Sequence, residues 1–181
     1  MPSRALLTEA QTISAAEITQ ALANQGITRV SLSAPVTRTS ATGTTLTNTG
    51  LTALTVSLLP SSRYRLTYRL FASGMPGFRL GFTFPSSLAQ FDGIAIFTDI
   101  VGGTGFYIYA DWPNNGFGNG DPIQEAIADP TQNGGLQFTA DITTGSTANT
   151  YGDFAVIFAQ QASNATASTM SQNSCVEVLK F

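Results

Sequence analysis

Histidine is missing from this chain of 181 residues, and cysteine occurs once, at Cys175. Without histidine there is no Ser-His-Asp triad, no Cys-His dyad and no histidine-ligated zinc or iron. A single cysteine excludes an internal disulfide and a multi-cysteine metal site. We therefore expect a non-enzymatic protein with no cofactor and no metal.

Charged residues are also scarce, at 10% of the chain, where about a quarter is usual. The net charge of −3 gives the chain no general attraction for nucleic acid. The N-terminus lacks the apolar core of a signal peptide, and no apolar run approaches transmembrane length. We expect a soluble protein made in a reducing compartment, with neither nucleic acid nor a membrane as partner.

The few charges are unevenly distributed along the chain. Residues 1–79 hold seven of the eight basic and two of the eleven acidic side chains, a balance of +5, whereas residues 80–181 have a balance of −8. Two explanations stay open. The halves pair as strands within one fold, or a basic flank of one subunit meets an acidic flank of the next.

The stretch from Arg63 to Pro85 has the clearest pattern. Apolar and polar residues alternate before and after a turn-forming segment, 72–77, with the period of half-buried strands. The pattern predicts a long antiparallel hairpin whose apolar face packs on another sheet, because two strands alone are not stable in water. Its other face would carry four arginines that could bind carboxylates of a neighbour: Arg63, Arg65, Arg69 and Arg79.

Further strand patterns are spread over the rest of the chain. Phe154 to Ala159 is continuously apolar, as in a central strand buried on both faces. A short helical turn is expected over 123–129. Residues 28–38 suit an edge strand or a linker, and the remaining strands are expected at 51–58, 94–97, 106–109, 136–142 and 174–181. Together they predict an all-β protein, a jelly-roll-like antiparallel β-sandwich over residues 28–181.

Residues 1–27 are predicted to form an N-terminal arm with a short helix. Ser14 and Glu17 have the spacing of a capping box, and Gly26 would cap the C-terminus. About three turns is too short to be stable alone, so the helix must dock on its own sandwich or on a neighbour. Its candidate contact residues are Ile13, Ile18 and Leu22.

The loop-like segment 111–122 is rich in Gly, Asn and Pro, and aromatic residues gather around it. Trp112 and Phe117 are candidate contact residues if they are exposed; otherwise the aromatics cover the core edge. A calcium loop is disfavoured because Pro113 stands where an Asp or Asn ligand is needed. Carboxylates are frequent from Asp92 to Asp129, but loop aspartates commonly cap turns.

Two stretches resemble structural proteins of tailed bacteriophages in which a β-sandwich decorates the head or lies in tail fibres. One runs from Leu46-Thr47-Asn48-Thr49 to Gly77-Phe78-Arg79-Leu80-Gly81-Phe82 and Pro85. The other runs from Gly152-Asp153-Phe154 to Asn173-Ser174-Cys175-Val176-Glu177-Val178. The resemblance lies in the pattern of strands, and residues 86–149 have no part in it.

The resemblance implies a virion protein, and the absence of a coiled-coil or repetitive shaft favours a capsid decoration (cement) protein over a long fibre. The expected partners are the major capsid protein, which the chain would bridge, and further copies of itself in a homotrimer. The alternative is a receptor-binding or tail-fibre tip domain that recognises a cell-surface glycan through residues 107–121. A third possibility is a glycan hydrolase that uses two carboxylates.

Overall fold

Antiparallel strands make up most of the described chain, as the alternating patterns predict. The computed structural model describes residues 26–39, 45–73, 78–86, 88–99, 106–112, 122–125, 133–160 and 163–181. Its elements, in chain order, are β1 (Ile27–Ser31), β2 (Val36–Arg38), the 3-10 helix η1 (Thr52–Leu54), β3 (Val56–Ser57), β4 (Arg63–Ser73), β5 (Phe78–Thr83), β6 (Gln90–Asp99), β7 (Phe106–Trp112), β8 (Pro122–Glu125), β9 (Asn133–Thr143), the 3-10 helix η2 (Ala148–Thr150), β10 (Asp153–Gln160), β11 (Ser168–Met170) and β12 (Cys175–Lys180).

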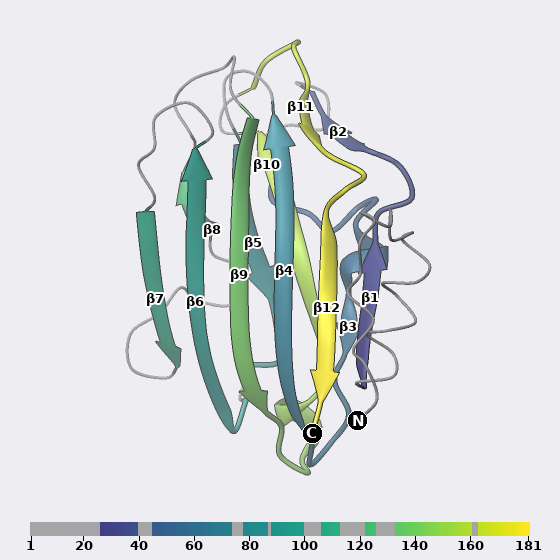
Figure 1. The fold of residues 1–181 in the computed structure, drawn as a ribbon, viewed down its shortest axis with the longest axis vertical. Helices are drawn as coiled ribbons and strands as arrows, with labels where there is room; N and C mark the ends of the chain where they lie inside the picture. Colours follow the sequence, from purple (N-terminus) through teal and green to yellow (C-terminus); the bar gives the residue numbers. More distant parts are fainter. Residues whose placement is uncertain are drawn as a thin grey trace, which may run out of the picture.

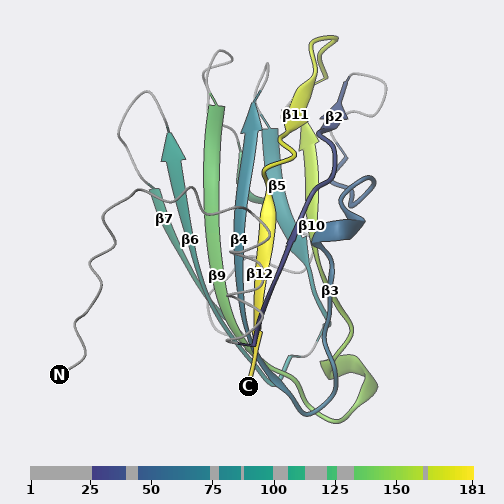
Figure 2. The ribbon, with the colours of Figure 1, turned by 45° about the vertical axis from the view of Figure 1, so that its right-hand side comes forward.

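The strands form two sheets. The large sheet has the order β1-β12-β4-β9-β6-β7, with β11 pairing to β4 and β2 pairing to β11; the small sheet has the order β3-β10-β5-β8. Figure 1 shows the large sheet in front of the small one, and Figure 2 shows the two layers obliquely. An all-β, antiparallel fold is therefore confirmed.

The predicted hairpin over residues 63–85 is wrong, because β4 and β5 belong to different sheets. β4 pairs with β9 along its whole length and with β12, whereas β5 pairs with β10 and β8. Both strands have the expected apolar face, but these faces meet across the two layers. The rings of Tyr68 and Phe82 lie 5.0 Å apart between their centroids. Alternation identifies the buried face of a strand without identifying its neighbour.

Aromatic rings fill the space between the sheets. Phe82 of the small sheet stacks on Phe138 of the large sheet at 4.4 Å, and Phe154 lies 5.9 Å from Tyr68. All four side chains are fully buried. The Tyr68 hydroxyl donates a hydrogen bond to the Leu54 carbonyl at 3.1 Å, which satisfies its polar atom in the core.

The continuous apolar run of β10 occupies the expected central position, between β3 and β5. Every residue from Phe154 to Gln160 is buried. Beyond the two-residue β3, the polar segment before η1 takes over the pairing with β10. Thr47 exchanges two backbone hydrogen bonds with Phe158, and the Asn48 side chain donates to the Val156 carbonyl at 2.8 Å.

Two local predictions are corrected. The expected strand over 51–58 is a 3-10 turn followed by the short β3, because Leu51 and Leu54 lie three residues apart and are both buried by a helical turn. The expected helical turn over 123–129 begins as a strand, since residues 122–125 pair with β5 as β8. Residues 126–129, the N-terminal helix and its contact residues Ile13, Ile18 and Leu22 lie outside the described residues.

Candidate interaction face

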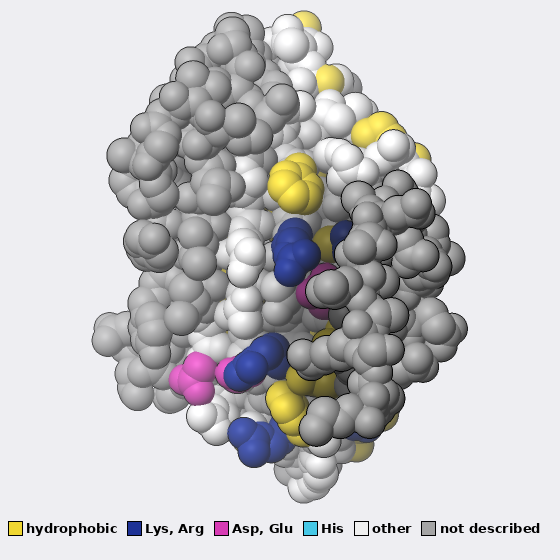
Figure 3. All heavy atoms as spheres, viewed as in Figure 1, with side chains coloured by type: hydrophobic (Ala, Val, Ile, Leu, Met, Phe, Trp, Pro, Cys, Tyr) yellow, Lys and Arg dark blue, Asp and Glu magenta, His cyan; other side chains and the backbone are white. Residues whose placement is uncertain are grey.

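The outward side of β4 combines positive charge with an exposed aromatic ring. Arg63, Arg65, Arg69 and Phe71 are exposed on this side, and the alternate residues of the strand are buried in the core: Tyr64, Leu66, Tyr68 and Leu70. Figure 3 shows basic side chains spaced along this face, with acidic side chains beside an upper one and beside a lower one. We call Arg63, Arg65 and Arg69, together with the C-terminal Phe181, the arginine face.

Arg65 is held by Asp141 on the neighbouring strand β9. The two residues are directly opposite in the ladder, and Arg65 Nε and Nη2 each donate a 2.8 Å hydrogen bond to one carboxylate oxygen. These hydrogen bonds lower the pKa of Asp141 below its ordinary value. The pair stays about half exposed. Because a guanidinium has five N–H donors, Arg65 retains donors that can reach a partner.

Glu177 of β12 lies between two further arginines. Its Oε1 lies 3.5 Å from Arg69 Nη1 and 3.9 Å from Arg29 Nη1. With the Arg65–Asp141 pair, these contacts join the basic half of the sequence to its acidic half inside one chain. They support the intramolecular explanation of the uneven charge distribution.

Arg63 lies beside the last residue of the chain. Its guanidinium is 6.0 Å from the centre of the Phe181 ring, and the Phe181 N–H donates to the Arg63 carbonyl at 3.0 Å. Phe181 is 66% exposed. A small cleft of about 140 Å³ lies next to this contact and is lined in part by Arg65, Asp92 and Asp141. The arginine face is therefore uneven, with a charged hollow beside an exposed ring.

Arg79 does not share this face, which corrects the prediction of four arginines on one sheet surface. It lies on β5 in the small sheet, opposite Ala159 and Glu125 in the ladders. The reason is the crossing of the chain between the sheets after β4. Of the aromatic candidates, Trp112 is the last residue of β7 and pairs with Phe91, and Phe117 lies outside the described residues.

Three aspartates occupy matching ladder positions in the large sheet. Asp92 of β6 is opposite both Asp111 of β7 and Asp141 of β9. The Gln90 side chain donates to Asp92 Oδ2 at 2.8 Å, and Asp141 is occupied by Arg65. No group of three or more metal-ligating side chains occurs among the described residues. The described aspartate contacts are thus those of a polar surface.

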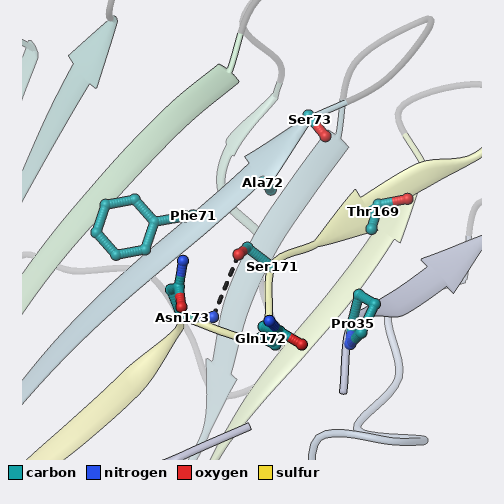
Figure 4. Close-up of a pocket in the computed structure, with 8 residues that line it drawn as sticks. All are labelled: Pro35, Phe71, Ala72, Ser73, Thr169, Ser171, Gln172 and Asn173. Carbon is teal, nitrogen blue, oxygen red and sulfur yellow. Dashed lines mark hydrogen bonds between the residues drawn. The ribbon is translucent and has the colours of Figure 1, made fainter. Parts of the chain in front are cut away.

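Sequence reasoning missed a cleft at the far end of β4. It has a volume of about 650 Å³ and is lined by Pro35, Phe71, Ala72, Ser73, Thr169, Ser171, Gln172 and Asn173 (Figure 4). We call it the Phe71 cleft. A signal for it was present, because Phe71 is an aromatic residue at a position where the alternation of β4 calls for a polar one.

No helix within the described ranges has the length and apolar character needed to cross a bilayer. Comparison with models of known protein families, with curated proteins and with solved structures gave no match to this chain.

Proposed function

We infer that the two sheets form a jelly-roll-like β-sandwich, and the strand order supports this. Four neighbouring strands of the large sheet have the order β1-β12-β4-β9, and the small sheet has the order β3-β10-β5-β8. Each sheet thus alternates strands from early and late in the chain. Double Greek-key connections of eight strands produce such an order. On this interpretation, β6 and β7 are an additional hairpin beside β9.

We propose that the protein is a non-enzymatic structural component of a tailed-bacteriophage virion, a capsid decoration (cement) protein that bridges major capsid subunits. The observation that carries the proposal is the strand order of the two sheets. We interpret this order as a jelly roll, and jelly rolls recur in viral capsid proteins. The resemblance of residues 46–85 and 152–178 to phage structural proteins supports the same setting. Fold alone does not determine function, so the proposal also draws on the surface.

The arginine face supports a role in protein contacts. Arginine and aromatic residues are enriched in interfaces between proteins. Arg65 and Arg69 are oriented by Asp141 and Glu177, which reduces the entropy lost when a partner binds. In the proposed assembly, this face contacts a neighbouring copy in a homotrimer. The N-terminal arm, with Ile13, Ile18 and Leu22, contacts the capsid.

A truncation tests the role of the arm. Deleting residues 1–26 leaves every strand from β1 onward, since β1 begins at Ile27. We expect the truncated protein to fold, as seen by circular dichroism, but not to co-sediment with capsids that lack the protein. Undiminished co-sedimentation of the truncated chain would contradict the proposed attachment.

Charge substitution tests the arginine face. Replacing both Arg63 and Arg69 by serine should reduce the trimer fraction in analytical ultracentrifugation, whereas Arg79→Ser, on the other sheet, is the comparison for a general loss of positive charge. A double variant that assembles like the wild type would exclude this face from the trimer contact.

A further inference from the structure

The Phe71 cleft begins next to the arginine face, because Phe71 follows Arg69 on the outward side of β4, but its described lining residues are uncharged. We propose that this cleft binds a neutral saccharide. The proposal goes beyond capsid decoration, which requires no small ligand, and it concerns residues other than the aromatic segment 107–121.

The first argument is the composition of the cleft. Phe71 is 41% exposed and offers an apolar ring, and Ser73, Thr169, Ser171, Gln172 and Asn173 surround it with hydroxyl and amide groups. Figure 4 shows Phe71 and Asn173 on one side and Pro35 on the other. None of the described lining residues carries a charge. The volume of about 650 Å³ is within the usual range of small-molecule sites.

This composition selects among ligand classes. A purely apolar ligand would leave the amides and hydroxyls without partners, which is costly. A charged ligand would find no opposite charge among the described lining residues. A saccharide presents C–H groups on one face and hydroxyls around its rim. The ring of Phe71 can pack against the C–H face of the sugar. The amide and hydroxyl side chains can donate hydrogen bonds to the sugar hydroxyls and accept them.

The second argument is that the cleft is already built. The turn between β11 and β12 is tied to β4 by the Ser171 N–H, which donates to the Phe71 carbonyl at 2.8 Å, and by the Phe71 N–H, which donates to Ser174 Oγ at 3.0 Å. Within the turn, the Asn173 N–H donates to Ser171 Oγ at 3.2 Å (Figure 4). A preformed site lowers the cost of ordering on binding.

The third argument is that the polar groups are available. Gln172 and Asn173 are both exposed. Their backbones shape the turn, and no described residue is hydrogen bonded to either side-chain amide. The two amides at the tip of a fixed turn, next to an exposed ring, can therefore direct their donors and acceptors to a ligand.

Nuclear magnetic resonance titration of the full chain tests the proposal. The probes are maltotriose, cellotriose and triacetylchitotriose, with sialyllactose as a charged comparison. We expect at least one neutral probe to shift the amide signals of residues 71–73 and 169–173. The proposal is overturned if no neutral probe shifts these signals, or if only sialyllactose does.

Variants then locate the binding. Phe71→Ala should weaken binding of the active probe by about tenfold, while Phe181→Ala, which removes another exposed aromatic ring, should leave it unchanged. Asn173→Ala, in an exposed turn, gives a second test that does not depend on the β4 side chain. Binding that survives both Phe71→Ala and Asn173→Ala would overturn the proposal.

Discussion

Arg38 is buried against Phe158, although the two residues are 120 positions apart in the sequence. Arg38 Nε donates to the Phe158 carbonyl at 3.3 Å, and the guanidinium lies 5.6 Å from the centre of the Phe158 ring. The same guanidinium donates to the carbonyls of Thr37, Thr47 and Thr49. The Arg38 side chain thus links the polar segment before η1 to the central strand β10 through hydrogen bonds.

Arg38→Lys should destabilise the fold by about 2 kcal/mol, because a lysine ammonium cannot bond several carbonyls arranged around a planar fork, so the buried positive charge loses most of its hydrogen bonds. Urea unfolding measures the change. Arg29→Lys is the matched control. The contact of Arg29 with Glu177 is long, at 3.9 Å, and Arg29 is partly exposed. This substitution should therefore lower the unfolding free energy by less than about 1 kcal/mol. Equal losses in the two variants would contradict the clamping role of Arg38.

The Arg65–Asp141 pair should make a small, pH-dependent contribution to stability. The pKa of Asp141 is lowered in the folded state, chiefly by the hydrogen bonds from Arg65. The contribution is therefore present above the unfolded-state pKa of about 4 and is lost as the pH falls through the lower folded-state pKa.

At neutral pH, Arg65→Ala should cost less than about 1 kcal/mol, because the pair is exposed. The unfolding free energies of the variant and the wild type should converge once the pH is below the folded-state pKa of Asp141. Thermal unfolding at a series of pH values measures this. A difference that does not change with pH would show that Arg65 acts through packing and not through its charge.

The buried Tyr68 should stay protonated in alkaline solution. Burial raises its pKa, so the unfolded state loses the proton first, near pH 10. Stability is full below that pH and falls as the pH rises above it. Tyr68→Phe should flatten this alkaline fall in the unfolding free energy and cost about 1 kcal/mol at neutral pH, from the lost bond to Leu54. An unaltered alkaline profile would exclude Tyr68 as its cause.

Gly93 is needed for the aromatic core. A Cβ added there would lie 3.0 Å from Phe138 Cε2 and 3.2 Å from Phe91 Cζ. Because both rings are packed in the core, Gly93→Ala should cost about 1–3 kcal/mol in chemical denaturation. Phe138→Leu, which removes ring atoms, should reduce the cost of Gly93→Ala in a double-mutant cycle. Additive losses would argue that the clash is not with Phe138.

The sequence predicted buried faces better than it predicted neighbours. Alternation in β4 and β9 and the continuous run in β10 placed the core residues correctly, because burial on one or two faces imposes its own period. The pattern did not predict that β4 and β5 belong to different sheets. A turn-like segment between two amphipathic strands fits a hairpin and a connection between two sheets equally well. The spacing of Leu51 and Leu54 fitted a strand or a helical turn, and burial decided for the turn.

The candidate sites were predicted only in part. Arg63, Arg65 and Arg69 share a face because residues two or four apart along one strand must do so. Arg79 was assigned to that face through the wrong hairpin. The clamp of Arg38 and the Phe71 cleft depend on contacts between distant segments, such as Phe71 with the turn at 171–173, and no local pattern reveals such contacts.

Quantitative mass spectrometry of purified virions, combined with cryo-electron microscopy of the same particles, tests the central claim that this protein decorates a phage capsid. We predict that the chain is present in a copy number comparable to that of the major capsid protein, with trimeric density on the outside of the shell at the junctions of capsid subunits. A few copies confined to the tail, or none in the particle, would contradict it.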